Sequence, residues 1–240
     1  MIFSLIEREN IFCGHLWEKG AREKNEDSLA FWQVNKGRHQ KVMAVICDGI
    51  GGLSQGEQAS SYVVRQMANW FMSEGYKHKR KHRIKMLQQL LFQMDEELKC
   101  YGQEKGIRLG TTVTIVLLDN LQLSWFHCGD CRLYLFRGRK VKKITKEHQN
   151  ENGNLNRAIG VGKWSLLDIG KMRIRKTDKI LLCTDGLYRN INPDELQIWG
   201  GREVENDEQA KRMLKQLFQM KVSRGEKDNL SAIYFGYAKK

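Results

Sequence analysis

Proline is almost missing from this chain of 240 residues, in which Pro193 is the only one. No stretch rich in proline, glycine and serine interrupts the sequence, so no linker between domains is indicated. Hydrophobic residues make up 41% of the chain, which is enough for a core and excludes a disordered protein. We therefore expect residues 1–240 to form a single domain, which is compatible with this length.

Long hydrophobic runs are also missing. None approaches the roughly 18–20 apolar residues that a membrane span needs. The first ten residues, MIFSLIEREN, have no basic start and too short an apolar stretch for a secretory signal peptide. Three of the six cysteines, Cys47, Cys128 and Cys183, lie in or at the end of apolar runs, where cysteine behaves as a small hydrophobic residue. These features predict a soluble, cytoplasmic protein with reduced thiols.

Acidic residues are too few to balance the basic ones, since 28 Asp and Glu stand against 41 Lys and Arg and the formal net charge is +13. Six of the positive charges fall within residues 76–86, YKHKRKHRIKM, which contain no acid. Such a run could bind nucleic acid, an acidic protein or anionic lipid. Stacking aromatic residues do not interleave with the charges, so we favour a solvated loop or helix start and do not expect nucleic-acid binding.

The hydrophobic pattern predicts many short strands and three helices. Apolar, β-branched and alternating residues indicate strands at 2–7, 11–17, 28–34, 41–47, 111–118, 121–127, 132–136, 141–145, 166–174, 179–184 and 230–237. Helical spacing of apolar residues indicates amphipathic helices over 56–71, 84–101 and 204–220. This order predicts an α+β fold of two stacked antiparallel sheets with helices outside, because that arrangement buries every apolar face.

The stretch AVICDGIGG, residues 44–52, combines a buried-strand pattern with an acid and several glycines. The apolar run stops at Asp48, and three glycines follow within four residues. A tight turn explains this pattern, because Asp-Gly is a common turn dipeptide. A site where an anion or a metal ion comes close to the backbone explains it equally well.

Acids also flank other predicted strand ends. They are Glu26, Asp27, Asp130, Asp185 and Asp228. Each one alone is typical of a turn or a solvated loop. If their strand ends meet at one edge of the sandwich, however, the carboxylates repel one another, and a hard divalent cation such as Mg²⁺ or Mn²⁺ relieves that repulsion. The set therefore favours a metal site.

Seven segments in order make the chain similar to the metal-dependent serine/threonine protein phosphatases of the type 2C (PPM) family, in their bacterial form. They are REKNEDS (22–28), CDGIGGLSQGEQAS (47–60), GTTVTIV (110–116), HCGDCRLYLFR (127–137), NRAIG (156–160), LLCTDGLY (181–188) and EKDNLSAIYF (226–235). Each is weak alone, but the set spans nearly the whole chain. The resemblance implies a β-sandwich of two antiparallel sheets flanked by helices on both outer faces, and hydrolysis of phosphoserine and phosphothreonine in proteins.

The resemblance also implies a two-metal site. Asp48 would bridge two Mn²⁺ or Mg²⁺ ions, the Gly49 carbonyl would bind the first, and Asp185 and Asp228 would hold the second. A metal-bridged hydroxide would then attack phosphorus in line with the leaving oxygen. No covalent phosphoenzyme would be required.

Further roles follow by the same resemblance. Glu26 and Asp27 would hold metal-bound waters or lie in the inner shell, and Asp130 would bind a third, weaker metal. Arg22 would bind the substrate phosphate, because a guanidinium group matches two phosphate oxygens. The expected partners are phosphorylated proteins, the substrates of a bacterial serine/threonine kinase, and the chain is expected to be a monomer.

Two departures from the family pattern concern the site. Ile50 stands where the animal branch has a histidine general acid, as in bacterial members, so a metal-bound water would replace it. Only QNENGNL separates His148 from Asn156, where the family usually has a longer segment with a mobile flap. Substrate selection and the metal at Asp130 depend on that segment. We expect a structural role for His148.

The motif CGDC, residues 128–131, is a third departure, since Cys131 occupies a position that is usually a small residue in the family. A lone CxxC can be a redox pair or half of a zinc site. No second half of a zinc site is present in the sequence, so we favour a place in the core or at a strand end. Oxidation of the pair beside Asp130 is a further hypothesis.

Other functions compete with the phosphatase. Within the same superfamily, the chain could dephosphorylate a partner that resembles an anti-anti-sigma factor. In another class, it could be a pseudophosphatase or a basic binding scaffold. Retention of the acids and of Arg22 favours an enzyme, since a pure scaffold is free to lose them.

Overall fold

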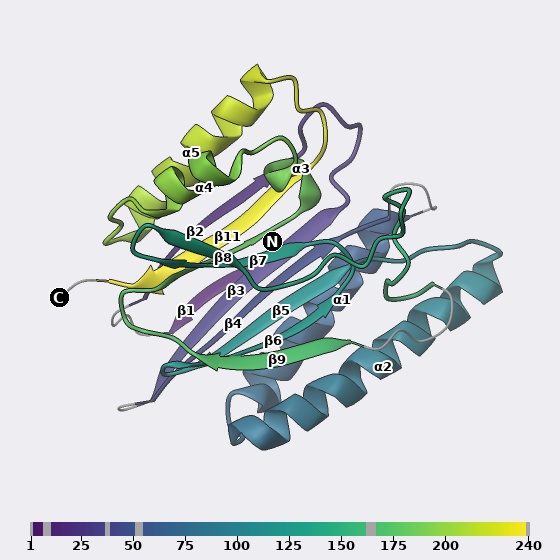
Figure 1. Ribbon diagram of the computed structural model, residues 1–240. Coiled ribbons are helices and arrows are strands. Elements are labelled where there is room, and N and C mark those ends of the chain that lie inside the picture. Colours follow the sequence, from purple (N-terminus) through teal and green to yellow (C-terminus); the bar gives the residue numbers. More distant parts are fainter. Residues whose placement is uncertain (1, 7–10, 37–38, 51–54, 162–166, 239–240) are drawn as a thin grey trace.

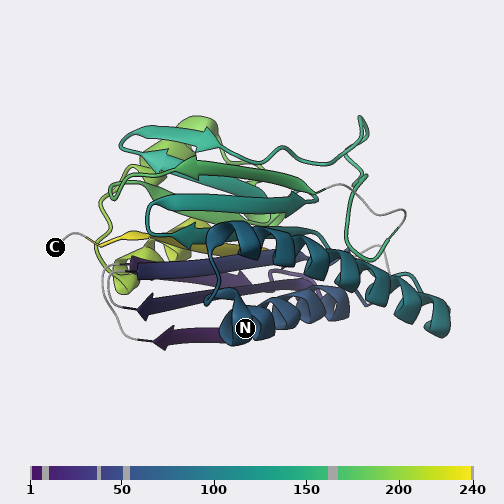
Figure 2. The same ribbon diagram turned by 90° about the horizontal axis from the view of Figure 1, so that it is seen from below.

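Two β-sheets stack face to face, and helices cover both outer faces of the sandwich (Figures 1 and 2). The structure is a computed structural model, and it describes residues 2–6, 11–36, 39–50, 55–161 and 167–238. Helices α1 and α2 cover one sheet, and α4 and α5 cover the other. The α+β sandwich with helices on both outer faces, predicted from the sequence, is confirmed.

The first sheet has six strands in the order β1-β3-β4-β5-β6-β9. Their bounds are β1 Ile2–Ile6, β3 Asp27–Lys36, β4 His39–Asp48, β5 Val113–Asp119, β6 Gln122–Cys128 and β9 Asp168–Arg173. Neighbouring strands are antiparallel except at the edge, where β1 runs parallel to β3. This exception arises because the chain builds β2 in the other sheet before it returns as β3.

The second sheet has five antiparallel strands in the order β2-β11-β10-β7-β8. Their bounds are β2 Ile11–Glu18, β7 Arg132–Arg137, β8 Lys140–Lys143, β10 Lys179–Cys183 and β11 Leu230–Tyr237. The last strand of the chain therefore lies between β2 and β10. This pairing brings the residues around Arg22 next to those just before β11.

The three predicted helices form, and two shorter ones join them. The bounds are α1 Gly56–Trp70, α2 Arg80–Lys105, α3 Asp185–Tyr188, α4 Pro193–Gly200 and α5 Asp207–Ser223, with a π-helical turn, Phe71–Gly75, after α1. Helix α4 has a local cause that the sequence analysis missed: a capping box between Asn192 and Glu195, with Pro193 in the first turn. Among the described residues, no helix is long and apolar enough to cross a membrane.

Strand β4 is apolar from Val42 to Cys47 because both faces are buried there. Met43, Val45 and Cys47 pack toward α1 and α2, whereas Val42 and Ala44 pack in the core between the sheets. A central strand of a layered fold has this pattern, and it explains the continuous apolar run before Asp48. The strand therefore carries its final carboxylate to the end of the sandwich.

The basic run at 76–86 is only partly solvated. Lys77, Lys79, Lys81 and Lys85 are exposed, and α2 begins within the run, as expected. Arg83 differs from them, since its side chain is fully buried and bonds Asp119 through Nη2. The expectation of a solvated segment is therefore wrong for Arg83, because the helix turns this residue toward the end of β5.

Candidate active site and metal centre

Acidic residues from both sheets meet at one end of the sandwich. Strand β3 begins at Asp27 and β4 ends at Asp48, and the two residues are paired in register. Strands β10 and β11 are likewise paired, so Asp185, just after β10, lies beside Asp228, just before β11. The two sheets are linked at this end because the hydroxyl of Thr184 donates to Asp27 Oδ2 at 3.0 Å. The strand ends that carry these acids therefore meet at one edge of the sandwich, which is the condition that the sequence analysis set for a metal site.

Burial and crowding raise the pKa values of three of these carboxyl groups, Asp27, Asp48 and Asp185. Burial, followed by the charges of Asp27 and Asp185, raises the pKa of Asp48. Burial also raises the pKa of Asp27 to about 7, although hydrogen bonds from Ser231 and Thr184 act in the other direction. Carboxylates that repel one another in this way form a donor set of hard oxygen atoms, which fits a divalent cation.

Asp185 belongs to the same electrostatic cluster. Burial and the charge of Asp130 raise its pKa to about 6, while Arg189 lowers it. The Asp185 side chain lies in the first turn of α3, directly after the buried strand β10. The short helix thus turns the carboxylate toward the end of the sandwich where Asp48 lies.

Position 49 requires a glycine because backbone atoms of two other segments pack closely against it. A Cβ atom there would lie 2.4 Å from the Gly56 carbonyl oxygen and 2.7 Å from the Glu26 carbonyl oxygen. The Gly49 amide donates to that Glu26 oxygen at 3.1 Å. The Asp-Gly pair therefore marks a crossing of three backbone segments at the candidate site. Gly51 and Gly52 lie outside the described residues.

Two threonines hold the backbone of Asp48, and the sequence analysis gave them no role. Thr111 Oγ1 donates to the Asp48 carbonyl at 2.9 Å, and the Thr112 amide donates to the same oxygen at 2.8 Å. The Asp48 amide in turn donates to Thr112 Oγ1 at 2.9 Å. The motif GTTVTIV thus fixes the position of Asp48. The sequence signal for this role is a pair of threonines at the start of a strand.

Glu26 is positioned by a residue that the sequence analysis also missed. The Glu26 amide donates to Asn229 Oδ1 at 2.9 Å, and Asn229 Nδ2 donates to the carbonyls of Lys19 and Lys24. Burial, followed by the charge of Glu57, raises the pKa of Glu26. Asn229 therefore ties the segment before β3 to the start of β11.

Arg22 reaches the site but binds a carboxylate there. Its Nε and Nη2 atoms each lie 3.0 Å from one of the two Asp228 carboxylate oxygens. The side chain is 54% exposed. Its fork geometry is the one that also matches two oxygens of a phosphoryl group.

A second arginine, Arg189, binds the same acids. It forms an ion pair with Asp185 through Nη2, and its Nη1 atom lies 3.5 Å from Asp228 Oδ2. The sequence analysis missed it, although a basic residue four positions after Asp185 is a recognisable helical pairing signal. Within the described residues, no three His, Cys, Asp or Glu side chains form a group that could hold one ion. Arg22 and Arg189 form ion pairs with Asp185 and Asp228 instead.

Asp130 forms no ion pair with Arg22 or Arg189 among the described contacts, and it is held by the shortened segment after His148. Gln149 Nε2 donates to Asp130 Oδ2 at 2.9 Å, while Asp130 Oδ1 is buried and has no hydrogen-bond partner. His148 Nδ1 accepts a bond from the Gly129 amide at 3.1 Å. The ring lies 3.1 Å from Asp168 Oδ2 through Nε2. His148 thus has a structural position, as expected.

The two cysteines of the CGDC motif contribute to different cores. Cys128 belongs to the core beneath α1 and α2, whereas Cys131 lies between the sheets. Burial raises the pKa of Cys128 to about 12 and also raises that of Cys131. Both are free thiols. These positions fit the core role and offer neither paired thiolates nor half of a zinc site.

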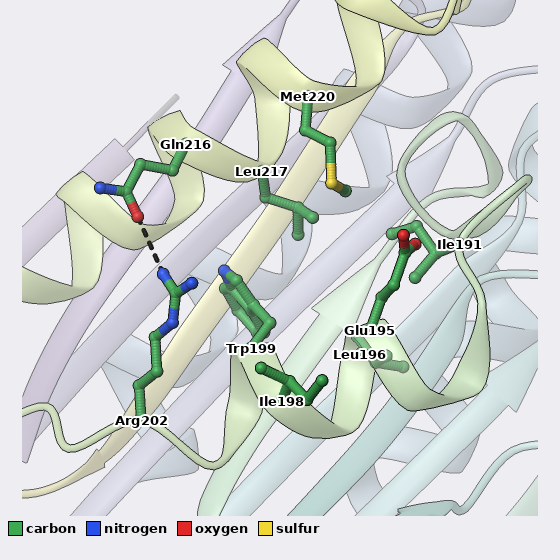
Figure 3. Close-up of a pocket in the computed structure, with 9 residues that line it drawn as sticks. All are labelled: Ile191, Glu195, Leu196, Ile198, Trp199, Arg202, Gln216, Leu217 and Met220. Carbon is green, nitrogen blue, oxygen red and sulfur yellow. Dashed lines mark hydrogen bonds between the residues drawn. The ribbon is translucent and has the colours of Figure 1, made fainter.

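A separate pocket of about 240 Å³ lies between α4 and α5 (Figure 3). Its lining is mainly apolar and includes Ile198, Trp199 and Leu217, and Arg202 bonds Gln216 at its rim. None of the candidate site residues lines it. The acidic end of the sandwich is therefore a different surface from this pocket.

The fold has clear counterparts among solved structures. The serine/threonine phosphatase Stp1 from Staphylococcus aureus superposes with a TM-score of 0.83 at 23% sequence identity, covering 95% of this chain and 94% of that chain. This likeness defines the fold class, a sandwich of two sheets with helices on both outer faces.

Within that class, the chain belongs to the protein phosphatase 2C family, because the family model matches residues 19–233. The serine/threonine phosphatase stp of Listeria monocytogenes is 22% identical over 197 residues, which cover 73% of this chain and 77% of that protein. The protein phosphatase PhpP of Streptococcus pneumoniae is 24% identical over 217 residues, which cover 76% and 81%. The predicted family and its enzyme class, a protein phosphatase, are confirmed, and this family is generally metal-dependent.

Proposed function

We propose that this protein hydrolyses phosphoserine and phosphothreonine in phosphorylated proteins at the acidic end of the sandwich. The observation that carries the proposal is the meeting of Asp27, Asp48, Asp185 and Asp228 from both sheets. Burial and mutual repulsion raise the pKa values of the first three. The names of the Listeria and Streptococcus relatives support the reaction class.

Two Mn²⁺ or Mg²⁺ ions fit this donor set. Asp48 would be shared between them, with the Gly49 carbonyl on the first ion and Asp185 and Asp228 on the second. Glu26 and Asp27 would act through water, and Asp130, with one unpartnered oxygen, would serve a third ion. When bound, such ions polarise the phosphoryl group and lower the pKa of water, which supplies the nucleophile.

The protein's own residues would bind and orient the phosphoryl group. Arg22 is half exposed, so its guanidinium can move from Asp228 to two phosphoryl oxygens and stabilise the charge that develops there. No side chain is assigned as general acid, since Ile50 is apolar and His148 is buried and bonded to Asp168. Water would therefore donate the proton to the leaving serine or threonine oxygen.

Hydrolysis of p-nitrophenyl phosphate and of a phosphothreonine peptide tests this proposal. The wild type would be measured with Mn²⁺, with Mg²⁺ and with EDTA, beside Asp185→Asn and the control Asp194→Asn, which changes an exposed acid on α4. We expect metal-dependent turnover that falls at least about 100-fold in Asp185→Asn and is unchanged in the control. A folded wild type without turnover in any metal would instead favour the pseudophosphatase or scaffold.

The expected setting of the enzyme rests on sequence features. We propose that its substrates are proteins phosphorylated by a bacterial serine/threonine kinase and that it acts as a monomer in the cytoplasm. The free cysteines are compatible with a reducing compartment. Whether one substrate resembles an anti-anti-sigma factor would be tested with such a phosphoprotein in the same assay.

A further inference from the structure

Arg189 bridges the two acids that would hold the second metal ion. Its Nη2 atom pairs with Asp185 Oδ2, and its Nη1 atom lies 3.5 Å from Asp228 Oδ2. Arg22 contacts both carboxylate oxygens of Asp228 but forms no ion pair with Asp185 among the described contacts. Arg189 is thus the cation that spans the same two carboxylates as the proposed metal ion.

The Arg189 backbone is held by hydrogen bonds, whereas its side chain is half exposed. The Arg189 amide donates to the Asp185 carbonyl at 2.8 Å, and the Arg189 carbonyl accepts a bond from Lys221 Nζ. Lys221 is 1% exposed on α5 and also pairs with Glu226 at 3.2 Å. The Arg189 side chain, by contrast, is 51% exposed. The guanidinium can therefore leave the two acids without a change in the fold around it.

Two arginines match the charges of Asp185 and Asp228. Asp185 and Asp228 carry two negative charges when ionised, and Arg22 and Arg189 supply two positive charges within ion-pair distance. A divalent ion that binds the Oδ2 atoms of both acids must displace Arg189 from them. The arginine contacts therefore reduce the free energy that metal binding gains.

We infer that Arg189 is a built-in competitor of the second divalent ion for Asp185 and Asp228, and that it sets the metal concentration that this enzyme requires. The inference rests on the proposed function. It predicts that this site binds a divalent ion more weakly than the same carboxylates would without Arg189. It also predicts that the metal-free protein keeps its acidic end ordered, because Arg189 replaces part of the missing charge.

Calorimetric titration of the metal-free protein with MnCl₂ tests the inference without an activity readout. The variants are Arg189→Gln, which removes the cation, and Arg189→Lys, which keeps the charge but loses the fork geometry. Arg224→Gln is the matched control, because Arg224 forms a comparable half-exposed pair with Glu195 on α4, outside the acidic cluster. We expect Arg189→Gln to bind Mn²⁺ roughly threefold to tenfold more tightly than the wild type. Arg189→Lys should lie between them, and Arg224→Gln should match the wild type.

Each other outcome has a distinct meaning. Equal or weaker Mn²⁺ binding by a folded Arg189→Gln overturns the competition while the metal site stands. A gain of equal size in Arg224→Gln also overturns it, since the effect would then be one of net charge. Binding by neither the wild type nor Arg189→Gln overturns the proposed metal site and the inference with it. A melting curve in EDTA provides a second readout, because Arg189→Gln should melt a few degrees lower than the wild type and gain more from Mn²⁺.

Discussion

At the residue scale, polar side chains are buried in specific hydrogen-bonded positions. His127 is fully buried in β6, where Nδ1 lies 2.9 Å from Thr114 Oγ1 and Nε2 lies 3.0 Å from the Lys146 carbonyl oxygen. The carbonyl requires a proton on Nε2, and the Thr114 hydroxyl can donate to Nδ1 of the neutral ring. Burial, followed by the charge of His148, lowers the pKa of His127 to about 4.

This environment predicts a pH-dependent contribution to stability. In the unfolded chain a histidine binds a proton as the pH falls below about 6.5, whereas the folded ring resists until about 4. The unfolded state then holds more protons, so stability is present above pH 6.5 and is lost as the pH falls. Between pH 7 and 5 we expect the wild type to lose roughly 1–2 kcal/mol more unfolding free energy than His127→Gln.

Urea unfolding in EDTA at both pH values measures this difference. The acidic cluster acts with the opposite sign in the same range, because protonation relieves the repulsion of Asp27 and Asp185, so only the comparison between the two proteins is informative. His82→Gln, which changes an exposed ring on α2, is the control and should follow the wild type. Parallel losses in wild type and His127→Gln would contradict the prediction.

At the element scale, α2 combines a buried anchor with an exposed basic end. Arg83 points inward and pairs with Asp119 at the end of β5, while lysines before and after it face solvent. Asp119 is paired with Lys41 near the start of β4, and Asp48 lies at the other end of that strand. The basic end of α2 is therefore at the opposite end of the sheet from the acidic cluster.

Removing the exposed charges should consequently leave the chemistry intact. We expect Lys→Ser at positions 77, 79, 81 and 85, with Arg83 retained, to keep turnover of p-nitrophenyl phosphate within about twofold, because exposed charges this far away are screened. Reduced turnover of an acidic phosphoprotein alone would show that the run docks substrates. Equal turnover of both would exclude docking. Loss of small-substrate turnover in the folded variant would contradict the prediction.

Arg83→Leu is the contrasting variant for the same helix. It leaves Asp119, which is 21% exposed, without its cation, so we expect a loss of about 2 kcal/mol in unfolding free energy. The serine variants should lose much less, because exposed side chains of this kind contribute little to stability.

At the scale of the whole molecule, the two sheets depend on a shared core. Phe31 of β3 and Phe235 of β11 pack across it with ring centroids 5.4 Å apart, and Ile46 of β4 belongs to the same cluster as Leu182 of β10. The inner face of each sheet is buried against the other sheet. Neither half of the sandwich is therefore expected to be stable alone.

This shared core predicts one cooperative unfolding transition for the single domain. Far-ultraviolet circular dichroism and tryptophan fluorescence should give the same midpoint, and the calorimetric and van't Hoff enthalpies should agree. Light scattering after gel filtration should give the monomer mass of about 28 kDa. Two separated transitions would contradict the single domain, and a doubled mass would contradict the monomer.

Much of the fold and site could be predicted from the sequence because its signals are local. The continuous apolar run before Asp48 marks a strand that is buried on both faces, and the helical spacing after Gly56 marks α1. The acids follow or precede such strands directly, so their meeting required only that the strand ends share one edge. Helix α4 had an equally local signal in its capping box.

The sequence by itself determined the strand and helix pattern, the family and the candidate acids, because periodicity and short motifs depend on neighbouring residues. The tertiary structure decided which cation lies on which carboxylate. Arg22 and Asp228 are 206 positions apart, and Gln149 and Asp130 are 19 positions apart. It also brought Asp228 to Arg189 and buried Arg83 against Asp119. Such contacts depend on strand register and on the stacking of the sheets, which bring distant residues together, and no local pattern in the chain specifies them.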